Sequence, residues 1–346
     1  TMETEEEEKQ KVVLILGNGF DLDMHYVTKY GDFVESAYFA PMVGGKIPDE
    51  ILIQEKDASK MQIVPNGLAR YIADFEEHNK WVDLELCVRD YCKKHVNDTD
   101  TAIIEKEFYA LRFFLYNFIS RSYRARIGAR EIGRNNTEVS YVLIDSIAHS
   151  KTDWNIWSFN YTKICEDLLK GFGVEDAEIN NRVHHIHGTI YGENDNTNIV
   201  LGIGYDGEIM KVCPEAIKSQ WKNYTQLKKL YDKHIQDAEH IIIMGHSVGD
   251  TDAQYFYSIM DNTRLKSITI LTDTTQSLNR IKHNLDKWTK SKFGTRVEKG
   301  DLKQISFTSS EYSSIDNYYE LAYGQRFATK ESIAKLKTLL ESYNAK

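Results

Sequence analysis

The 346-residue sequence has few prolines and few cysteines. Its four cysteines, at positions 87, 92, 165 and 213, form no C-x-x-C pair. This spacing indicates neither a disulfide framework nor a cysteine-rich zinc site. The four prolines stand apart, and no Pro/Ser-rich linker or internal repeat interrupts the chain. These absences are typical of a compact helical or α/β protein.

Positive charge and long apolar runs are also lacking. Lys and Arg number 43 against 52 Asp and Glu, a formal net charge of −9. This balance excludes a general nucleic-acid wrapper, because phosphate binding needs concentrated Lys and Arg. No apolar run approaches the about 20 residues of a membrane helix, and no basic-then-apolar signal segment opens the chain. We therefore expect a cytoplasmic globular protein without membrane or direct nucleic-acid partners.

Apolar runs alternate with helical patterns along most of the chain. Val12–Leu16 is a continuous apolar run, which is typical of a strand in a parallel sheet covered by helices on both faces. Further strands are predicted at Asn155–Phe159, Val183–His187, Ile199–Ile203, His240–Met244 and Ser267–Thr272. Helices are predicted near Thr28–Phe39 and at Lys163–Gly171, Glu215–Gln236, Asp252–Met260 and Ser277–Lys290. This alternation predicts an α/β fold with a mainly parallel sheet.

Residues 49–126 differ, because their apolar residues recur at spacings of three and four with almost no strand signal. We interpret them as a helical insertion that either covers a pocket or builds an oligomer interface. Residues 11–48 and 127–300 form the α/β core in this division. Residues 1–10 are expected to be a disordered acidic tail, and residues 301–346, with a helix over Lys330–Tyr343, to pack on the core.

Four polar motifs follow predicted strands. They are Gly17-Asn18-Gly19-Phe20-Asp21, Ser158-Phe159-Asn160-Tyr161-Thr162, His185-Ile186-His187-Gly188 and Gly245-His246-Ser247-Val248-Gly249-Asp250. In an open α/β sheet, ligands bind outside the carboxyl ends of the strands. The four motifs together therefore predict a binding site at that edge, although each alone is a weak signal.

The first and last motifs each have two interpretations. Gly17 and Gly19 allow backbone N–H groups to approach a phosphate, or they simply form a strand-to-helix turn. The last motif fits the G-x-S-x-G nucleophile elbow around Ser247. Only His283 follows it, inside an amphipathic helical segment, which disfavours a serine-hydrolase triad. The alternative is a turn in which Gly245 and Ser247 contact a nucleotide ribose.

Asn160 and His187 are the candidate catalytic residues. Asn160 ends an apolar strand, where its amide must bond to backbone or ligand. His187 ends the next strand and is placed to act as a general base, with His185 expected on the same strand face. No carboxylate stands at metal-ligand spacing from these histidines, so no metal is expected.

With these motifs in order, the chain resembles the AbiH family of bacterial abortive-infection proteins over roughly residues 12 to 275. Trp81-Val82-Asp83-Leu84-Glu85 resembles the W-x-D-x-E element of that family. Asp83 and Glu85 are two residues apart, so on a helix at most one of them would point at the pocket.

The same order is similar, more distantly, to the sirtuin-like fold of bacterial defence NADases. The resemblance implies a Rossmann-like nucleotide-binding core. It matches Gly17 and Gly19 to the loop glycines, Asn160 to the Asn that holds the nicotinamide ribose and the attacking water, and His187 to the base. Gly245 and Ser247 match the ribose-contacting turn, and Asp273 the contact to the adenosine ribose. Asn18, Phe20, Asp21 and Gly188 complete the implied nucleotide contacts.

Three departures stand out in this comparison. Asn18 replaces the Ala of the loop, Asp21 stands where sirtuins have a Ser, and Thr162 replaces the Asp that follows the catalytic Asn. The zinc cysteines of deacetylating sirtuins are missing, which argues against protein-lysine deacetylation.

The resemblance implies an anti-phage abortive-infection effector that hydrolyses NAD to nicotinamide and ADP-ribose. NAD or a related nucleotide is then a substrate. A homo-oligomer and a phage-derived or partner-protein trigger are further candidate partners. Two alternatives stay open: a non-catalytic nucleotide-binding sensor, and a serine hydrolase that uses Ser247.

Overall fold

The computed structural model describes residues 8–79, 83–98, 101–128, 138–191, 198–308 and 330–344. Six parallel strands form one sheet in the order β3-β2-β1-β4-β5-β6. Their bounds are β1 Lys11–Leu16, β2 Asp153–Ser158, β3 Val183–His185, β4 His240–Met244, β5 Ser267–Thr272 and β6 Lys303–Thr308. The strand order reverses between β1 and β4, the position where open α/β sheets bind ligands. The predicted Rossmann-like α/β class is confirmed.

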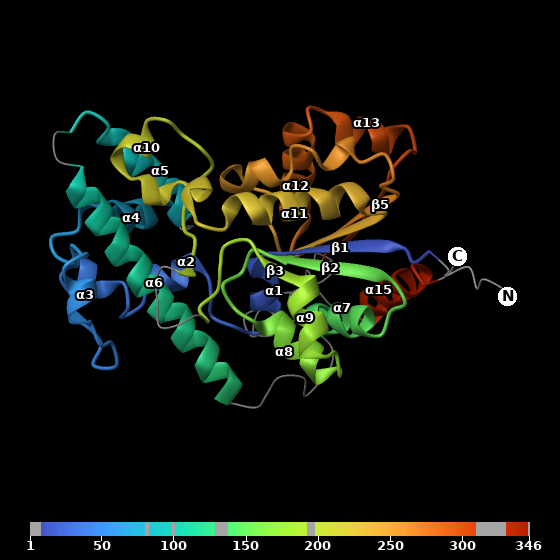
Figure 1. Ribbon diagram of the computed structural model, residues 1–346, viewed down its shortest axis with the longest axis horizontal. Coiled ribbons are helices and arrows are strands. Elements are labelled where there is room, and N and C mark those ends of the chain that lie inside the picture. Colours follow the sequence, from blue (N-terminus) through green and yellow to red (C-terminus); the bar gives the residue numbers. More distant parts are fainter. Residues whose placement is uncertain are drawn as a thin grey trace.

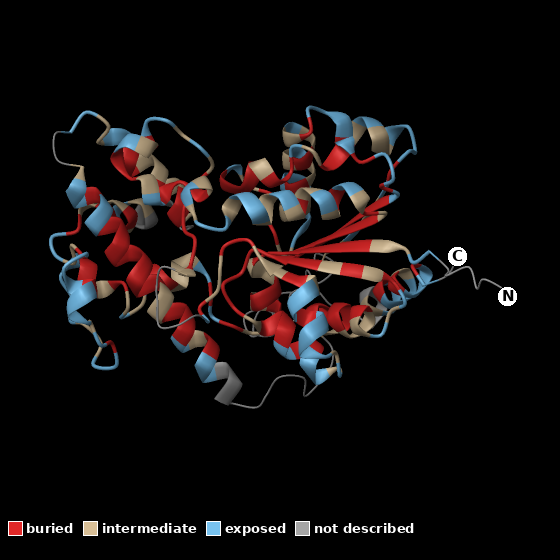
Figure 2. Cartoon of the chain, viewed as in Figure 1, coloured by how far each residue is buried: buried red, intermediate tan, exposed pale blue. Residues whose placement is uncertain are grey.

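The central strands are apolar on both faces because helices cover both faces. In β1, Val12 and Leu14 belong to one buried cluster, whereas Val13 and Ile15 belong to the other. The first cluster packs under α7 (Val139–Ala148), α8 (Ile164–Gly171), α9 (Asp176–Arg182) and α15 (Lys330–Ser342). The second packs under α11 (Tyr224–Asp237), α12 (Thr275–Trp288) and α13 (Lys292–Glu298). Figure 1 shows these two helical layers around the sheet, and Figure 2 shows the buried residues that run through it.

A further group of helices lies beyond the carboxyl ends of the strands (Figure 1). We call it the helical layer: α3 (Glu55–Ala58), α4 (Gly67–Asn79), α5 (Leu84–Lys94), α6 (Ala102–Gly128) and α10 (Ile209–Val212). The short helices α1 (Asn18–Asp23) and α2 (Tyr30–Val34) lead from β1 toward it. In α6 every residue from 107 to 115 is buried, so this part of the helix is covered by neighbours on all sides and not along one face only.

Several predicted elements were wrong. Ile199–Ile203 is not a strand but makes isolated bridges, Gly188 to Ile199 and Ile203 to Ile217. Its apolar residues are buried because the segment crosses the core, not because it joins the sheet. The sequence reading missed β6, whose side chains are exposed or half-buried and so lack a continuous apolar run.

Two predicted helices are replaced by 3-10 turns, one in its first part and the other throughout. Glu215–Gln236 is helical only from Tyr224 onward, and Asp252–Met260 forms the 3-10 turns η5 (Asp250–Tyr255) and η6 (Ile259–Asp261). Lys218 lies in the first region and Asp252 in the second, and their buried side chains form an ion pair with each other. This tertiary contact overrides the helical spacing of the sequence.

The division into domains stays a prediction. Among the described residues, 49–126 contain helices and no strand, while residues 303–308 and 330–342 add β6 and α15 to the body around the sheet. The first seven residues of the expected acidic tail lie outside the described part of the chain. No helix in the described ranges is long and apolar enough to cross a bilayer.

Candidate functional site

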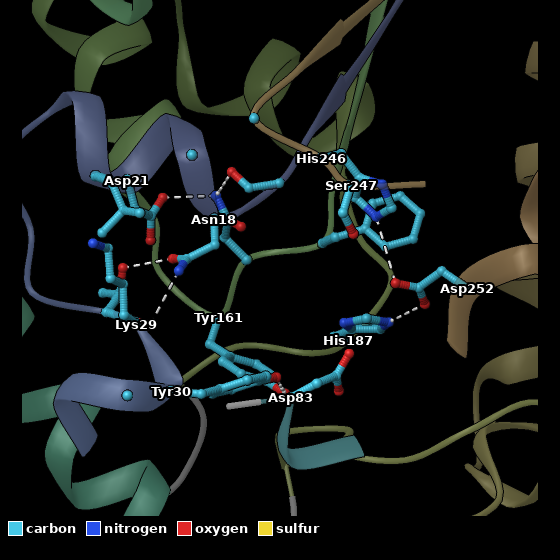
Figure 3. Close-up of a pocket in the computed structure, with 18 of the residues that line it drawn as sticks. Asn18, Asp21, Lys29, Tyr30, Asp83, Tyr161, His187, His246, Ser247 and Asp252 are labelled. Atoms are coloured by element: carbon cyan, nitrogen blue, oxygen red, sulfur yellow. Dashed lines mark hydrogen bonds and ion pairs between the residues drawn. The ribbon is translucent and has the colours of Figure 1, made fainter. Parts of the chain in front are cut away.

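A cavity of about 610 Å³ lies at the carboxyl edge of the sheet, between the strand ends and the helical layer. Figure 3 shows side chains from widely separated segments that face this space. The sequence-predicted residues that line it are Gly17, Asn18, Gly19, Asp21, Asn160, His187, Gly245, Ser247 and Asp273. The fold therefore brings all four motifs to one cavity. Whether they bind a nucleotide stays a prediction.

Two predicted contact residues do not line this cavity. Phe20 is 1% exposed and packs in the core beneath β1. Gly188 has a φ of +72°, and a Cβ there would lie 1.7 Å from the carbonyl oxygen of Asn198. Gly188 thus lets the segment after residue 198 cross close to His187, whose carbonyl accepts a hydrogen bond from the Val200 N–H at 2.7 Å.

The loop glycines join two loops to each other rather than forming an open phosphate cradle. A Cβ on Gly19 would lie 2.5 Å from the Cα of Gly245, and Gly17 is equally crowded by Gly245. The N–H groups of Gly17, Gly19 and Phe20 donate at 2.9 Å to Met244, Gly245 and Gly17 carbonyls respectively. These three N–H groups already have acceptors, which favours the strand-to-helix turn among the two interpretations of Gly17 and Gly19.

Asn160 is held by a buried carboxyl group. Its Nδ2 donates to the Gly17 carbonyl at 3.0 Å and to Asp21 Oδ1 at 2.7 Å, while Thr162 Oγ1 donates to Asp21 Oδ2 at 2.7 Å. Burial raises the pKa of Asp21 to about 7, although the bonds from Thr162 and Asn160 lower it. The amide nitrogen of Asn160 is committed to these bonds, which leaves its Oδ1 as the group for a ligand.

This arrangement predicts a pH-dependent contribution of Asp21 to stability. Because its pKa is raised from 3.8 to about 7, the folded chain holds a proton that the unfolded chain releases between these values. Its contribution is therefore fully present below about pH 4 and is lost as the pH rises through about 7. Asp21→Asn does not titrate, and Thr162 can reverse its hydroxyl to accept from the new amide. The stability of wild type relative to Asp21→Asn should fall by roughly 4 kcal/mol at most between pH 4 and 8.

Urea unfolding at pH 4.5, 6 and 8 measures this difference. Asp49→Asn, at a surface ion pair with Lys46, is the control and should show little change. A wild-type-minus-Asp21→Asn difference that does not vary with pH contradicts a proton on Asp21.

His187 belongs to a buried charged cluster. Its Nε2 lies 3.0 Å from Asp252 Oδ1, which also accepts from Lys218 Nζ at 2.7 Å. His246 Nε2 lies 3.4 Å from the other oxygen, Asp252 Oδ2. Burial alone would raise the pKa of Asp252, but Lys218 and His187 hold it well below its ordinary value. Asp252 is therefore an ionised acceptor.

The ionised Asp252 fixes the orientation and tautomer of His187. Because Asp252 accepts from Nε2, the neutral ring carries its proton there and leaves a lone pair on Nδ1. Figure 3 shows the edge of the ring opposite Asp252 turned into the cavity. Phe159 packs edge-on against the ring at 5.3 Å between centroids. His187 thus has the geometry of a general base.

His185 does not share this position, contrary to the prediction from strand alternation. β3 ends at His185, so His187 lies in the following turn. His185 instead lies 2.6 Å from Glu166 through Nε2 and 3.0 Å from the Asn160 carbonyl through Nδ1. Among the described residues, no group of three or more His, Cys, Asp or Glu side chains is arranged to hold a metal ion.

Asp83 and Glu85 both line the cavity, so the prediction that at most one of them points there was wrong. Asp83 is the N-cap of α5, with φ −110° and ψ 99°, and its Oδ1 accepts from the Leu86 N–H at 3.0 Å. Helical periodicity does not apply to an N-cap residue. Burial raises the pKa of Asp83 to about 6. Trp81 of the same element lies outside the described residues.

The sequence reading also left Asp252, His246 and Lys218 without a role. Asp252 and His246 stand within or next to the quoted fourth motif, so their position at the strand edge was available as a signal. No motif in the sequence marked Lys218, because this residue lies in the connection between β3 and α11, away from the strand ends that carry the motifs.

Ser247 lies at the cavity without the partners of a serine nucleophile. The left-handed backbone of this loop falls on Gly245 and Val248, with φ of 64° and 54°, rather than on Ser247. His283 is exposed on α12 and is not among the residues that line the cavity. Across the described part of the chain, no hydrogen bond joins Ser247 Oγ to a histidine, so the geometry does not favour the serine-hydrolase alternative.

Comparison with known proteins places the chain among phage-defence proteins. No curated protein matches the sequence significantly. The family model described as "Bacteriophage abortive infection AbiH" matches residues 13–273, from β1 to the residue after β5. This match contains all four motifs, the W-x-D-x-E element and Lys218, and it supports an anti-phage abortive-infection role. Because it covers well over half of the sequence, the chain belongs to the AbiH family.

Proposed function

We propose that this protein is an abortive-infection effector of the cytoplasm that hydrolyses NAD to nicotinamide and ADP-ribose, and that a phage-derived or partner-protein trigger activates it. The observation that carries the proposal is the His187 ring. Its Nε2 bonds to the buried, ionised Asp252, and its opposite edge faces a cavity that Asn160 also lines.

The chemistry of this bond suits these groups. Water attacks C1′ of the nicotinamide ribose, His187 Nδ1 accepts the proton of the water, and the C1′–N bond breaks. Its electron pair leaves with nicotinamide, which departs neutral because the pyridine ring in NAD is cationic. No strong general acid is needed. The reaction instead requires positioning of water and ribose, the task proposed for Asn160, and a base, the task proposed for His187.

Two of the three departures from the sirtuin pattern, Asp21 and Thr162, compensate each other in space. The resemblance expects a hydroxyl at position 21 and a carboxylate at position 162, whereas this chain has Asp21 and Thr162. The two side chains are hydrogen-bonded at 2.7 Å. A carboxyl and a hydroxyl group are thus present at the same place with their positions exchanged, which supports recognition of the nicotinamide end there.

Among the described residues, the lysine and arginine side chains that line the cavity are Lys29 and Arg280. Since three N–H groups of the glycine loop already donate to carbonyls, we assign the pyrophosphate to these side chains. Asp273 lines the same cavity and is proposed to contact the adenosine ribose.

Incubation of the purified protein with NAD and an extract of phage-infected cells, which supplies the trigger, tests the proposal. Nicotinamide and ADP-ribose are followed by chromatography, with His187→Ala in the same extract as the background. We expect equimolar release of both products, and fluorophosphonate should leave Ser247 unlabelled. Absence of release from a chain whose melting temperature rises with NAD, by the same amount in Asn160→Ala and His187→Ala, favours the sensor alternative. Neither release nor a thermal shift contradicts an NAD site.

A further inference from the structure

Lys218 is a lysine with almost no exposed surface. It is 1% exposed, and it comes from the connection between β3 and α11. Its Nζ donates to Asp252 Oδ1 at 2.7 Å, to the Thr251 carbonyl at 3.0 Å and to Glu85 Oε2 at 3.1 Å. Three acceptors occupy the three N–H donors of the ammonium group. Burial alone would lower the pKa of Lys218, but Asp252 and Glu85 raise it above its ordinary value, so the group is charged.

Glu85 connects this lysine to the helical layer. It lies in the first turn of α5 and is 5% exposed. Its Oε1 accepts a hydrogen bond from the Gly202 N–H at 3.3 Å. The charged cluster therefore joins three parts of the chain: α5, the connection after β3, and the loop after β4 that carries Asp252.

The charges of this cluster limit which group takes up a further proton. Counted formally, one lysine against the two carboxyl groups of Glu85 and Asp252 gives the cluster a net −1. Removal of Lys218 leaves two buried carboxylates without their cation, a costly arrangement that draws in a proton. His246 is a poor acceptor, because its Nδ1 already accepts from the Val248 N–H at 2.9 Å. The remaining acceptors are the two carboxyl groups themselves and His187, through the Nδ1 that faces the cavity, and the imidazole has the higher ordinary pKa of these groups.

We propose that Lys218 is a positioning residue that supplies the counter-charge of Asp252, so that His187 stays neutral with a free Nδ1, and that Glu85 anchors Lys218 to the helical layer. The expected effect on kcat rests on the proposed function, whereas the expected protonation state of the His187 ring does not.

Other charged or titratable groups near His187 are the same in every variant compared. Asp83 and Tyr161 face the ring from the cavity side, and His246 faces Asp252 from the loop after β4 (Figure 3). Tyr255 of η5 lies next to Asp252 and has its pKa raised by burial first and by Asp252 second. Burial first and Glu85 second raise the pKa of Asp83 and of Tyr161, and Lys218 lowers that of Asp83, so the variants also change the charges that these two groups experience.

The first test uses ¹⁵N-histidine NMR at pH 7, without nucleotide, with His187 assigned by the loss of its signals in His187→Ala. In wild type we expect a proton on Nε2 and none on Nδ1. In Lys218→Met we expect Nδ1 to become protonated. In Lys218→Met/Glu85→Gln, which restores the net −1, we expect Nδ1 to be free again. The matched control Lys228→Met removes a lysine paired with Asp232 on α11 and should leave the ring unchanged.

Kinetics supply the second readout. Lys218→Met should lower kcat at pH 7 by about 10²-fold with KM changed less than about threefold, and activity should recover toward pH 9. The double variant should regain most of this loss at pH 7, which a purely steric role of Lys218 would not allow.

An unprotonated Nδ1 in Lys218→Met, or a double variant whose Nδ1 is protonated, overturns the inference. The protonation of Nδ1 in the double variant tests the inference even if Lys218→Met alone does not fold. If the NMR result is as expected but wild type never cleaves NAD, the proposed function fails while the role of Lys218 toward His187 stands.

Discussion

His187→Ala should lower kcat for NAD hydrolysis by about 10²–10⁴-fold, the usual contribution of a positioned general base. The dissociation constant for NAD should change only a few-fold, because the substitution leaves Lys29, Arg280 and the glycine loop in place. Single-turnover chromatography of nicotinamide release and calorimetric titration with NAD measure the two quantities separately.

The matched control is His283→Ala, which removes an exposed histidine outside the residues that line the cavity. It should retain wild-type turnover. If His187→Ala hydrolyses NAD at the wild-type rate, His187 is not the base. If His283→Ala is the inactive variant instead, the hydrolase alternative built on Ser247 returns.

Asn160→Asp should abolish turnover and destabilise the protein at neutral pH. The new oxygen would replace a donor 2.7 Å from Asp21 Oδ1 and 3.0 Å from the Gly17 carbonyl, so that acceptors face each other without a proton between them. An unsatisfied buried polar group costs about 1–3 kcal/mol. Two carboxyl groups in contact also raise each other's pKa, and a shared proton relieves the repulsion. The deficit should therefore be largest at pH 8 and shrink toward pH 5.

Urea unfolding at pH 5 and pH 8 measures the deficit. Asn284→Asp is the control, since Asn284 makes one exposed bond to the Ser247 carbonyl at 3.3 Å. A stability loss in Asn160→Asp that is equal at both pH values would show that the Asp21 contact does not determine the role of Asn160.

The parts of the fold that were predicted correctly from the sequence are the strands whose side chains are apolar and buried on both faces of the sheet. β4 and β5 were located to the residue because helices bury both their faces. β6 was missed because, among the described strands, it pairs with β5 alone and presents exposed or half-exposed side chains. Its place in the sheet depends on backbone hydrogen bonds, which leave no trace in side-chain hydropathy.

The site shows a similar division. Its position followed from four motifs at strand ends, because parallel strands deliver their carboxyl ends to one edge. The occupation of the glycine-loop N–H groups did not follow, since it depends on how closely Gly19 approaches Gly245. The Glu85–Lys218 pair joins residues 133 positions apart, and a single sequence contains no signal for such a contact. The argument from helical faces failed for Asp83, because this residue is the N-cap of α5 and does not lie within the helix.

The most direct test measures NAD in bacteria that express the wild-type chain or His187→Ala, before and after phage infection. We expect NAD to fall and phage yield to drop only in infected wild-type cells, with matching release of nicotinamide. Restriction of phage by the wild-type chain while NAD stays constant would contradict NAD hydrolysis as the means of defence. Equal restriction by His187→Ala would remove His187 from the mechanism.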